Sequence, residues 1–360
     1  MLTLINAKLK KVMGTGLVIA TTGLVLTACQ GKGAKTSSSS KANHSIALIT
    51  DSNGVDDHSF NQAAWSGFQA YGKEHGLSQG KGGYQYFQSS SASDYEPNFT
   101  QAVNAGYQTI YGVGYMLSDS VKTAAAKYPK KNFVITGKKN VASATFKSND
   151  SSYLAGVAAA YTTKTNTVGF IGGAKSSVID LFEAGYIQGV KDTAKKLSKN
   201  ITILDQYIGD FTSTDKAKSI AQSMYAKKAD IVYQAAGSAG NGVFQEAKDL
   251  NSEKAVNDKV WVIGVDIDQT SQGKYTAKGG QKSNFTLTSV LKGLNFAVKD
   301  IANKAYDGKF PGGKHLVYGL QHDGVSLTKG NLNSKTWKAV QQARQDIING
   351  KIKVATSPSK

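Results

Sequence analysis

Short apolar runs alternate with longer amphipathic segments along most of the chain. The first run, residues 46–49, is bounded by turn residues and predicts a strand buried on both faces. The following segment, residues 61–75, places Ala64 and Phe68 on one face and predicts a helix. The same alternation continues to residue 347. Repeated strand and helix units of this kind favour an α/β fold with parallel sheets.

The alternation pauses after Val141 and then starts again with a helix around residues 153–161. The chain of 360 residues is also longer than one typical domain. We therefore expect two similar Rossmann-like lobes, although the two halves share no convincing sequence identity.

The N-terminal segment has the features of a lipoprotein signal peptide. Residues 1–28 contain Lys8, Lys10 and Lys11, followed by an apolar stretch, and contain no acidic residue. The stretch ends in a lipobox-like sequence before Cys29, which is the single cysteine. A membrane-spanning helix that is never cleaved is the alternative, but such a helix needs about 20 apolar residues. We expect cleavage after residue 28 and a lipid on Cys29.

Residues 29–43 are rich in serine, glycine and lysine and predict a flexible tether. The formal net charge of the chain is +18, which suits anionic cell-wall polymers or lipid headgroups. Nucleic acid is another anionic partner, but the chain has no recognition motif for it, and export argues against it. We expect a lipid-anchored protein on the extracytoplasmic face of the cell membrane.

The turn after the first strand is a candidate ligand site. Asp51 ends the strand, and Ser59 with Gln62 forms a capping-box pattern for the next helix. Phe60 and Asn61 then fall in the first helical turn. Open α/β sheets bind ligands at such strand ends. A solvated turn with a buried phenylalanine is the alternative.

Two further carboxylates follow predicted strands, Asp119 and Asp266. In a doubly wound lobe they would lie at the same crevice edge as Asp51. Carboxylates accept paired hydrogen bonds, which suits sugar hydroxyls or the N–H edge of a base. Each of them could instead cap a helix.

Several of these motifs resemble those of the basic membrane protein (BMP) family of nucleoside-binding lipoproteins. The resemblance begins at Asp51, Asp56, Asp57 and residues 59–62, and continues through residues 153–156, 178–190, 262–269 and 288–292. It implies the type I periplasmic-binding-protein fold, in which the chain crosses between lobes three times. The expected first lobe is residues 44–143 and 281–313, and the expected second lobe is residues 144–280 and 314–360.

The resemblance also implies roles for individual residues. Phe60 and Phe182, one from each lobe, would stack on a base. Lys292, expected on a helix, would donate to ribose hydroxyls while paired with Asp266. Gly240 would bring backbone close to the sugar, and the base side would be contacted mainly by Asp51, Asn61 and Asp119.

Catalysis and metal binding are poorly supported by the sequence. The five histidines have no metal-ligand spacing, and no nucleophile motif is present. The Gly237 to Gly242 run lacks the spacing of a dinucleotide site. We therefore expect a binding protein without a cofactor or metal rather than an enzyme.

The expected function is capture of nucleosides, with purines preferred, by hinge closure of the lobes and delivery to an ABC permease. We expect a monomer that binds no nucleic acid. A receptor for another small hydroxylated ligand remains open, as does a basic surface adhesin. Binding by an adhesin would fall steeply with salt, whereas nucleoside binding would not.

Overall fold

The computed structural model describes residues 43–135 and 140–358. The expected signal peptide, Cys29 and nearly all of the tether lie outside these residues. In the described part, the chain forms two six-stranded sheets. Among the described helices, none is long and apolar enough to cross a membrane.

The strands of the first sheet are all parallel and follow the order β13-β5-β4-β3-β1-β2. Alternate residues of β1 face opposite sides: Ile46 and Leu48 pack in one core, and Ala47 and Ile49 in another. The strands are β1 (Ile46–Ile49), β2 (Tyr84–Phe87), β3 (Thr109–Gly112), β4 (Asn132–Ile135), β5 (Val141–Phe146) and β13 (His315–Tyr318).

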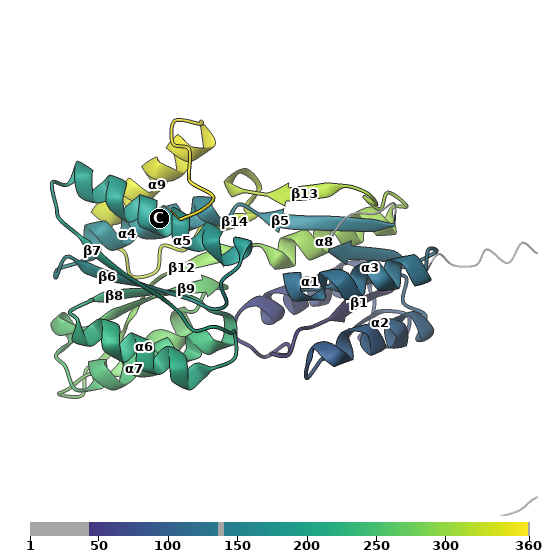
Figure 1. Ribbon diagram of the computed structural model, residues 1–360, viewed down its shortest axis with the longest axis horizontal. Coiled ribbons are helices and arrows are strands. Elements are labelled where there is room, and N and C mark those ends of the chain that lie inside the picture. The colour runs from purple at the N-terminus through teal and green to yellow at the C-terminus, as the bar shows by residue number, and fades with distance from the viewer. Residues whose placement is uncertain (1–42, 136–139, 359–360) are drawn as a thin grey trace, which may run out of the picture. The chain divides into compact units, whose positions relative to one another are not determined.

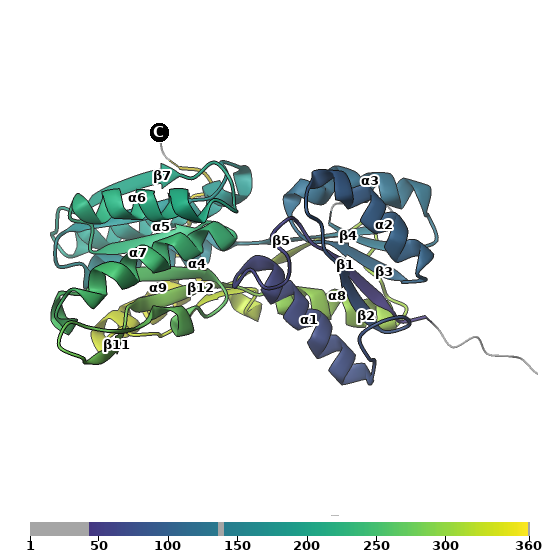
Figure 2. The same ribbon diagram turned by 90° about the horizontal axis from the view of Figure 1, so that it is seen from below.

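Helices cover both faces of the first sheet (Figure 2). On one face lie α1 (Phe60–His75) and α8 (Leu294–Tyr306), and on the other α2 (Tyr95–Asn104) and α3 (Ser118–Lys127). The apolar positions of α1 expected to face inward, Ala64 and Phe68, are fully buried. The expected amphipathic helix is confirmed, and it begins one residue earlier.

The second sheet has the order β14-β12-β9-β8-β6-β7, and only its edge strand β14 is antiparallel. A separate hairpin, β10 (Lys274–Thr276) and β11 (Lys282–Asn284), follows β9. The strands of the sheet are β6 (Thr167–Gly172), β7 (Thr202–Tyr207), β8 (Ile231–Ala235), β9 (Trp261–Asp266), β12 (Thr286–Lys292) and β14 (Val325–Leu327).

Five helices cover the second sheet, α4, α5 and α9 on one face and α6 and α7 on the other (Figure 1). Glycine lets α4 and α5 approach closely: a Cβ on Gly185 would lie 2.1 Å from the Asn149 carbonyl oxygen. The helices are α4 (Ser148–Thr162), α5 (Ser177–Lys196), α6 (Thr214–Ala226), α7 (Asn241–Ser252) and α9 (Ser334–Ile348). The predicted α/β fold with parallel sheets is confirmed.

The chain passes between the sheets three times: after β5, after β12 and after β13. We call residues 43–146 and 294–318 the first lobe and residues 147–293 and 319–358 the second lobe. The expected membership of two strands was wrong, because β12 lies in the second sheet and β13 in the first. The expected boundary after residue 143 also falls inside β5. A buried strand has the same apolar pattern in either sheet, so periodicity could not assign it.

Candidate functional site

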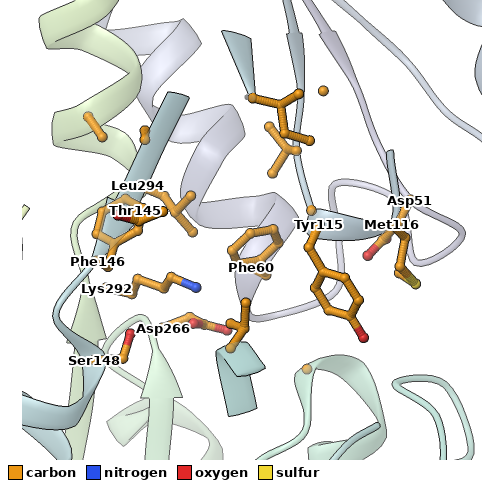
Figure 3. A pocket seen from close by; sticks show the side chains of 18 of the residues that line it. Asp51, Phe60, Tyr115, Met116, Thr145, Phe146, Ser148, Asp266, Lys292 and Leu294 are labelled. Atoms are coloured by element: carbon orange, nitrogen blue, oxygen red, sulfur yellow. The ribbon is translucent and has the colours of Figure 1, made fainter. Parts of the chain in front are cut away.

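A cavity of about 500 Å³ is lined by residues of both lobes (Figure 3). It lies where strands of both sheets end, since Asp51 follows β1, Asp266 ends β9 and Lys292 ends β12. This is the edge at which open parallel sheets place ligands. The volume is within the usual range for small-molecule sites, about 300–1,000 Å³.

Asp51 is buried in the turn after β1 and faces this cavity. Its Oδ1 accepts hydrogen bonds from the Asn53 backbone N–H at 3.0 Å and from the Asn61 amide at 2.7 Å. Asn61 is itself fully buried and does not line the cavity. The structure therefore brings Asp51 to the site as predicted, with Asn61 behind it as its hydrogen-bond partner.

The N-terminus of α1 is capped by Asp57, a residue whose role sequence reasoning missed. Its carboxylate accepts from the backbone N–H groups of Ser59, Asn61 and Gln62 at 2.9–3.0 Å. Burial nevertheless raises the pKa of Asp57 to about 6, because it outweighs these bonds. The expected cap by Ser59 was wrong: its hydroxyl donates instead to Asp266 Oδ2 at 2.5 Å. The adjacent pair Asp56 and Asp57 was the available signal.

Lys292 projects into the cavity among three aromatic rings. Its amine lies 4.7 Å from the ring centre of Phe60, 5.3 Å from Phe146 and 5.6 Å from Phe182. Such distances allow cation–π attraction. The expected helical position was wrong, since Lys292 is the last residue of β12. The Ser-x-x-Lys spacing fits a helix and a strand end equally well.

Asp266 is the opposite charge that acts on Lys292, and both residues are buried. Burial raises the pKa of Asp266, while the Lys292 charge and the Ser59 hydrogen bond oppose the rise. Burial likewise lowers the pKa of Lys292, and the Asp266 charge opposes that. Asp266 and Lys292 do not form a direct ion pair: the ion pairs among the described residues have N–O distances up to 4.0 Å, and this pair is not one of them. Each charge stabilises the other from a distance.

The two predicted stacking residues lie in the same cavity, one from each lobe. Phe60 is the first residue of α1 and is half-buried, whereas Phe182 lies in the second turn of α5 and is almost fully buried. Tyr115 of the first lobe and Phe211 of the second also line the cavity, with ring centres 6.5 Å apart. Tyr115, Phe146 and Phe211 were not predicted, because they lie outside the motifs.

Besides Asn61, two predicted residues are not brought to the cavity wall. Asp119 lies on the first turn of α3, with its side chain 94 % exposed and paired with Lys122 at 2.8 Å. Gly240 faces the interior of its own lobe, where an added Cβ would lie 2.1 Å from the Gln234 side-chain oxygen. The glycine of this turn that does line the cavity is Gly237, with φ +58°.

The part of the cavity beneath α8 is apolar. The Tyr111 hydroxyl found there donates to the Val298 carbonyl oxygen at 3.2 Å, so it is already engaged. No group of histidine, cysteine and acidic residues in the described ranges could hold a metal ion. The apolar lining residues include Tyr111, Val134, Ala144, Ala297, Val298 and Ile301. The site thus combines an aromatic, charged part with an apolar part.

Relatives of this chain cover nearly its whole length. It is 49 % identical to the ABC transporter nucleoside-binding protein BmpA of Lactococcus lactis, over 98 % of this chain and 99 % of that protein. It is 44 % identical to the CD4+ T-cell-stimulating antigen of Listeria monocytogenes, over 95 % and 97 % of the two chains.

The fold matches a solved solute-binding protein of an ABC transporter system from Aeropyrum pernix. The TM-score is 0.73 at 21 % identity, covering 88 % of this chain and 94 % of that one. The family of PnrA-like ABC transporter substrate-binding proteins matches residues 44–357. The chain therefore belongs to this family, the Bmp family, whose members bind substrates for transport and are not enzymes.

Proposed function

We propose that this protein captures nucleosides, with purines preferred, outside the cytoplasmic membrane by closure of its two lobes. It then delivers them to an ABC permease. The observation that carries the proposal is the pair of buried opposite charges, Asp266 and Lys292, which face one cavity together with Phe60 and Phe182. The naming of a relative at 49 % identity as nucleoside-binding supports it.

The ribose would bind between Asp266 and Lys292. A carboxylate accepts and an ammonium donates hydrogen bonds, so two neighbouring hydroxyls can satisfy both groups. Because the two groups do not form a direct ion pair in the described structure, a bound sugar would complete their hydrogen bonds without first breaking a salt bridge.

The base would lie against the Phe60 and Phe182 rings, with Asp51 accepting from its N–H edge. Stacking of a base on an aromatic ring contributes about 1–3 kcal/mol. The three hydrogen bonds that fix Asp51, two from Asn53 and one from Asn61, all end on Oδ1. This leaves Oδ2 for the ligand. Asp119 and Gly240 have no direct contact in this arrangement.

Closure of the lobes would trap the ligand, since the cavity walls come from both. A lipid on Cys29 would hold the protein at the membrane as a monomer. Replacing Cys29 with Ala should release the protein from membranes or leave the precursor uncleaved. A mature Cys29→Ala protein that still fractionates with membranes would contradict the lipid anchor.

Calorimetry of the domain from residue 43 onward tests the ligand directly. We expect purine ribonucleosides to bind more tightly than pyrimidine nucleosides, free bases or ribose, with little change between low and high salt. Binding of free sugars alone would indicate another hydroxylated ligand. Steep loss of binding to anionic polymers with salt, without nucleoside binding, would indicate an adhesin.

A further inference from the structure

The turn between β1 and α1 is joined to the second lobe by three hydrogen bonds. The Ser59 hydroxyl donates to Asp266 Oδ2 at 2.5 Å, and the Ser238 hydroxyl donates to Asn53 Oδ1 at 2.8 Å. The third bond runs from the Gln269 side-chain amide to the His58 carbonyl oxygen at 2.9 Å. All three must break if the lobes separate at this turn.

Gln269 is the most deeply buried of the second-lobe partners, with 1 % of its surface exposed. Its Oε1 accepts from the Val265 backbone N–H at 2.9 Å and from the Gln234 amide at 2.8 Å. Its Nε2 is the donor to His58. One side chain therefore links the ends of β8 and β9 to the first lobe. A buried polar group with complete partners fixes its surroundings, whereas one left without a partner is costly.

The space around this amide pair is fitted to it. A Cβ on Gly264 would lie 2.7 Å from Gln269 Oε1, and a Cβ on Gly240 would lie 2.1 Å from Gln234 Oε1. Larger residues at either glycine would displace the amides. Gly240, expected to approach the sugar, instead makes room for Gln234.

The backbone on both sides of the contact is in an unfavourable conformation. His58 has φ +54° and Asp266 has φ +63°, values that residues other than glycine adopt only infrequently. Such conformations persist where surrounding contacts fix them. Gln269 bonds to the His58 carbonyl directly and to Val265, the neighbour of Asp266, and so fixes both turns.

We propose that Gln269 is a positioning residue for ligand capture: it holds the Asp266 turn in place and stabilises the form in which the two lobes are closed. It does so without lining the cavity. The proposal rests on the proposed nucleoside-binding function. It assigns the coupling between closure and binding to a buried amide pair rather than to the ligand contacts alone.

Gln269→Glu tests the interlobe bond with little change of shape. A carboxylate retains an acceptor for Val265 and Gln234, but it cannot donate to the His58 carbonyl. Asn251→Asp is the matched control, because Asn251 is also a fully buried amide of the second lobe, bonded at 2.8 and 2.9 Å to Val260 alone. Both variants lose one buried amide donor, and only one of them loses it between the lobes.

The measurements are guanosine affinity, its dissociation rate, and the radius of gyration from X-ray scattering with and without guanosine. We expect Gln269→Glu to bind about tenfold more weakly or worse, to release guanosine faster, and to be more extended without ligand. Asn251→Asp should keep wild-type affinity and size. Should Gln269→Glu not fold, Ser238→Ala removes a separate interlobe bond and should also speed release.

Two failures can be told apart. If wild-type protein does not bind nucleosides, the proposed function is wrong. If wild type binds guanosine and Gln269→Glu matches Asn251→Asp in affinity, release rate and size, the positioning role is wrong. If Gln269→Glu does not fold, a wild-type release rate for Ser238→Ala overturns the proposal instead.

Discussion

Asp51 and Asp266 occupy comparable places, each at the carboxyl end of an interior parallel strand in its own lobe, yet they are held differently. Asp51 is fixed by Asn53 and Asn61 of its own lobe. Asp266 has positive φ and accepts from Ser59 of the other lobe. One carboxylate is therefore set before the lobes meet, while the other is completed by their contact.

The largest expected effect is that of Asp266→Asn. Hydrogen bonds to charged groups contribute about 1.5–3 kcal/mol, so ribonucleoside affinity should fall by roughly 10- to 150-fold. Dideoxynucleosides, which lack the two hydroxyls, should lose much less. The melting temperature without ligand should also drop, because Lys292 is left buried without an opposite charge.

Asp51→Asn provides the comparison for Asp266→Asn in the same calorimetric series. It should weaken ribonucleosides, dideoxynucleosides and free bases alike, because the proposed contact is to the base. If the two variants give the same pattern across these ligands, the division into a base carboxylate and a sugar carboxylate is wrong.

Replacement of Phe60 or Phe182 with Leu should weaken purine nucleosides by an amount up to the stacking energy, about 1–3 kcal/mol. Leucine keeps much of the apolar bulk, so the unfolding transition of the empty protein should stay close to wild type. Melting each variant with and without ligand separates the two effects. A lowered melting temperature with an unchanged ligand-induced shift would place that ring in the core.

The cap of α1 adjacent to Asp51 should give a pH dependence of stability. The pKa of Asp57 is about 6 in the folded protein, above its ordinary value of 3.8. The folded state therefore binds more protons than the unfolded state between about pH 4 and 6, and stability falls as pH rises through this window. Within this window the free energy of unfolding would fall by up to about 1.4 kcal/mol per pH unit for one such group.

Urea unfolding of wild type and Asp57→Asn between pH 4 and 7 measures this contribution. The difference between the two proteins should change across the window, since the variant has no carboxyl group at this position. A constant difference would show that the Asp57 carboxyl does not titrate there.

The smallest expected effect is that of Asp119→Ala. Its exposed ion pair with Lys122 is screened by water and contributes little to stability, and the side chain does not line the cavity. Calorimetry should therefore give the wild-type affinity. A large loss of affinity would mean that α3 moves toward the ligand on binding.

The fold could be predicted because each strand and helix carries its own apolar period, as Ile46 and Phe68 illustrate. The site could be predicted only in part. Asp51 and Asp266 were found because strand ends gather at one edge in any doubly wound sheet. Phe146 was missed, since nothing local distinguishes it from an ordinary buried strand residue.

The errors have a common physical cause, which is that they depend on contacts distant in sequence. Ser59 has the local signature of a helix cap, but its hydroxyl donates its hydrogen bond to the Asp266 carboxylate, 207 residues away in the sequence. The membership of β12 and β13 likewise depends on which strand lies beside them. Local pattern gives an element its type, and long-range pairing gives it its place.

The three passages of the chain between the sheets affect the order in which the protein can be completed. The first sheet has five of its six strands by residue 146, yet α8, which covers one of its faces, begins at Leu294. During synthesis this face is covered by α1 alone, without α8, until most of the chain has been made. Complete burial of this face therefore depends on a contact between residues far apart in the sequence, which is the kind of contact that slows folding.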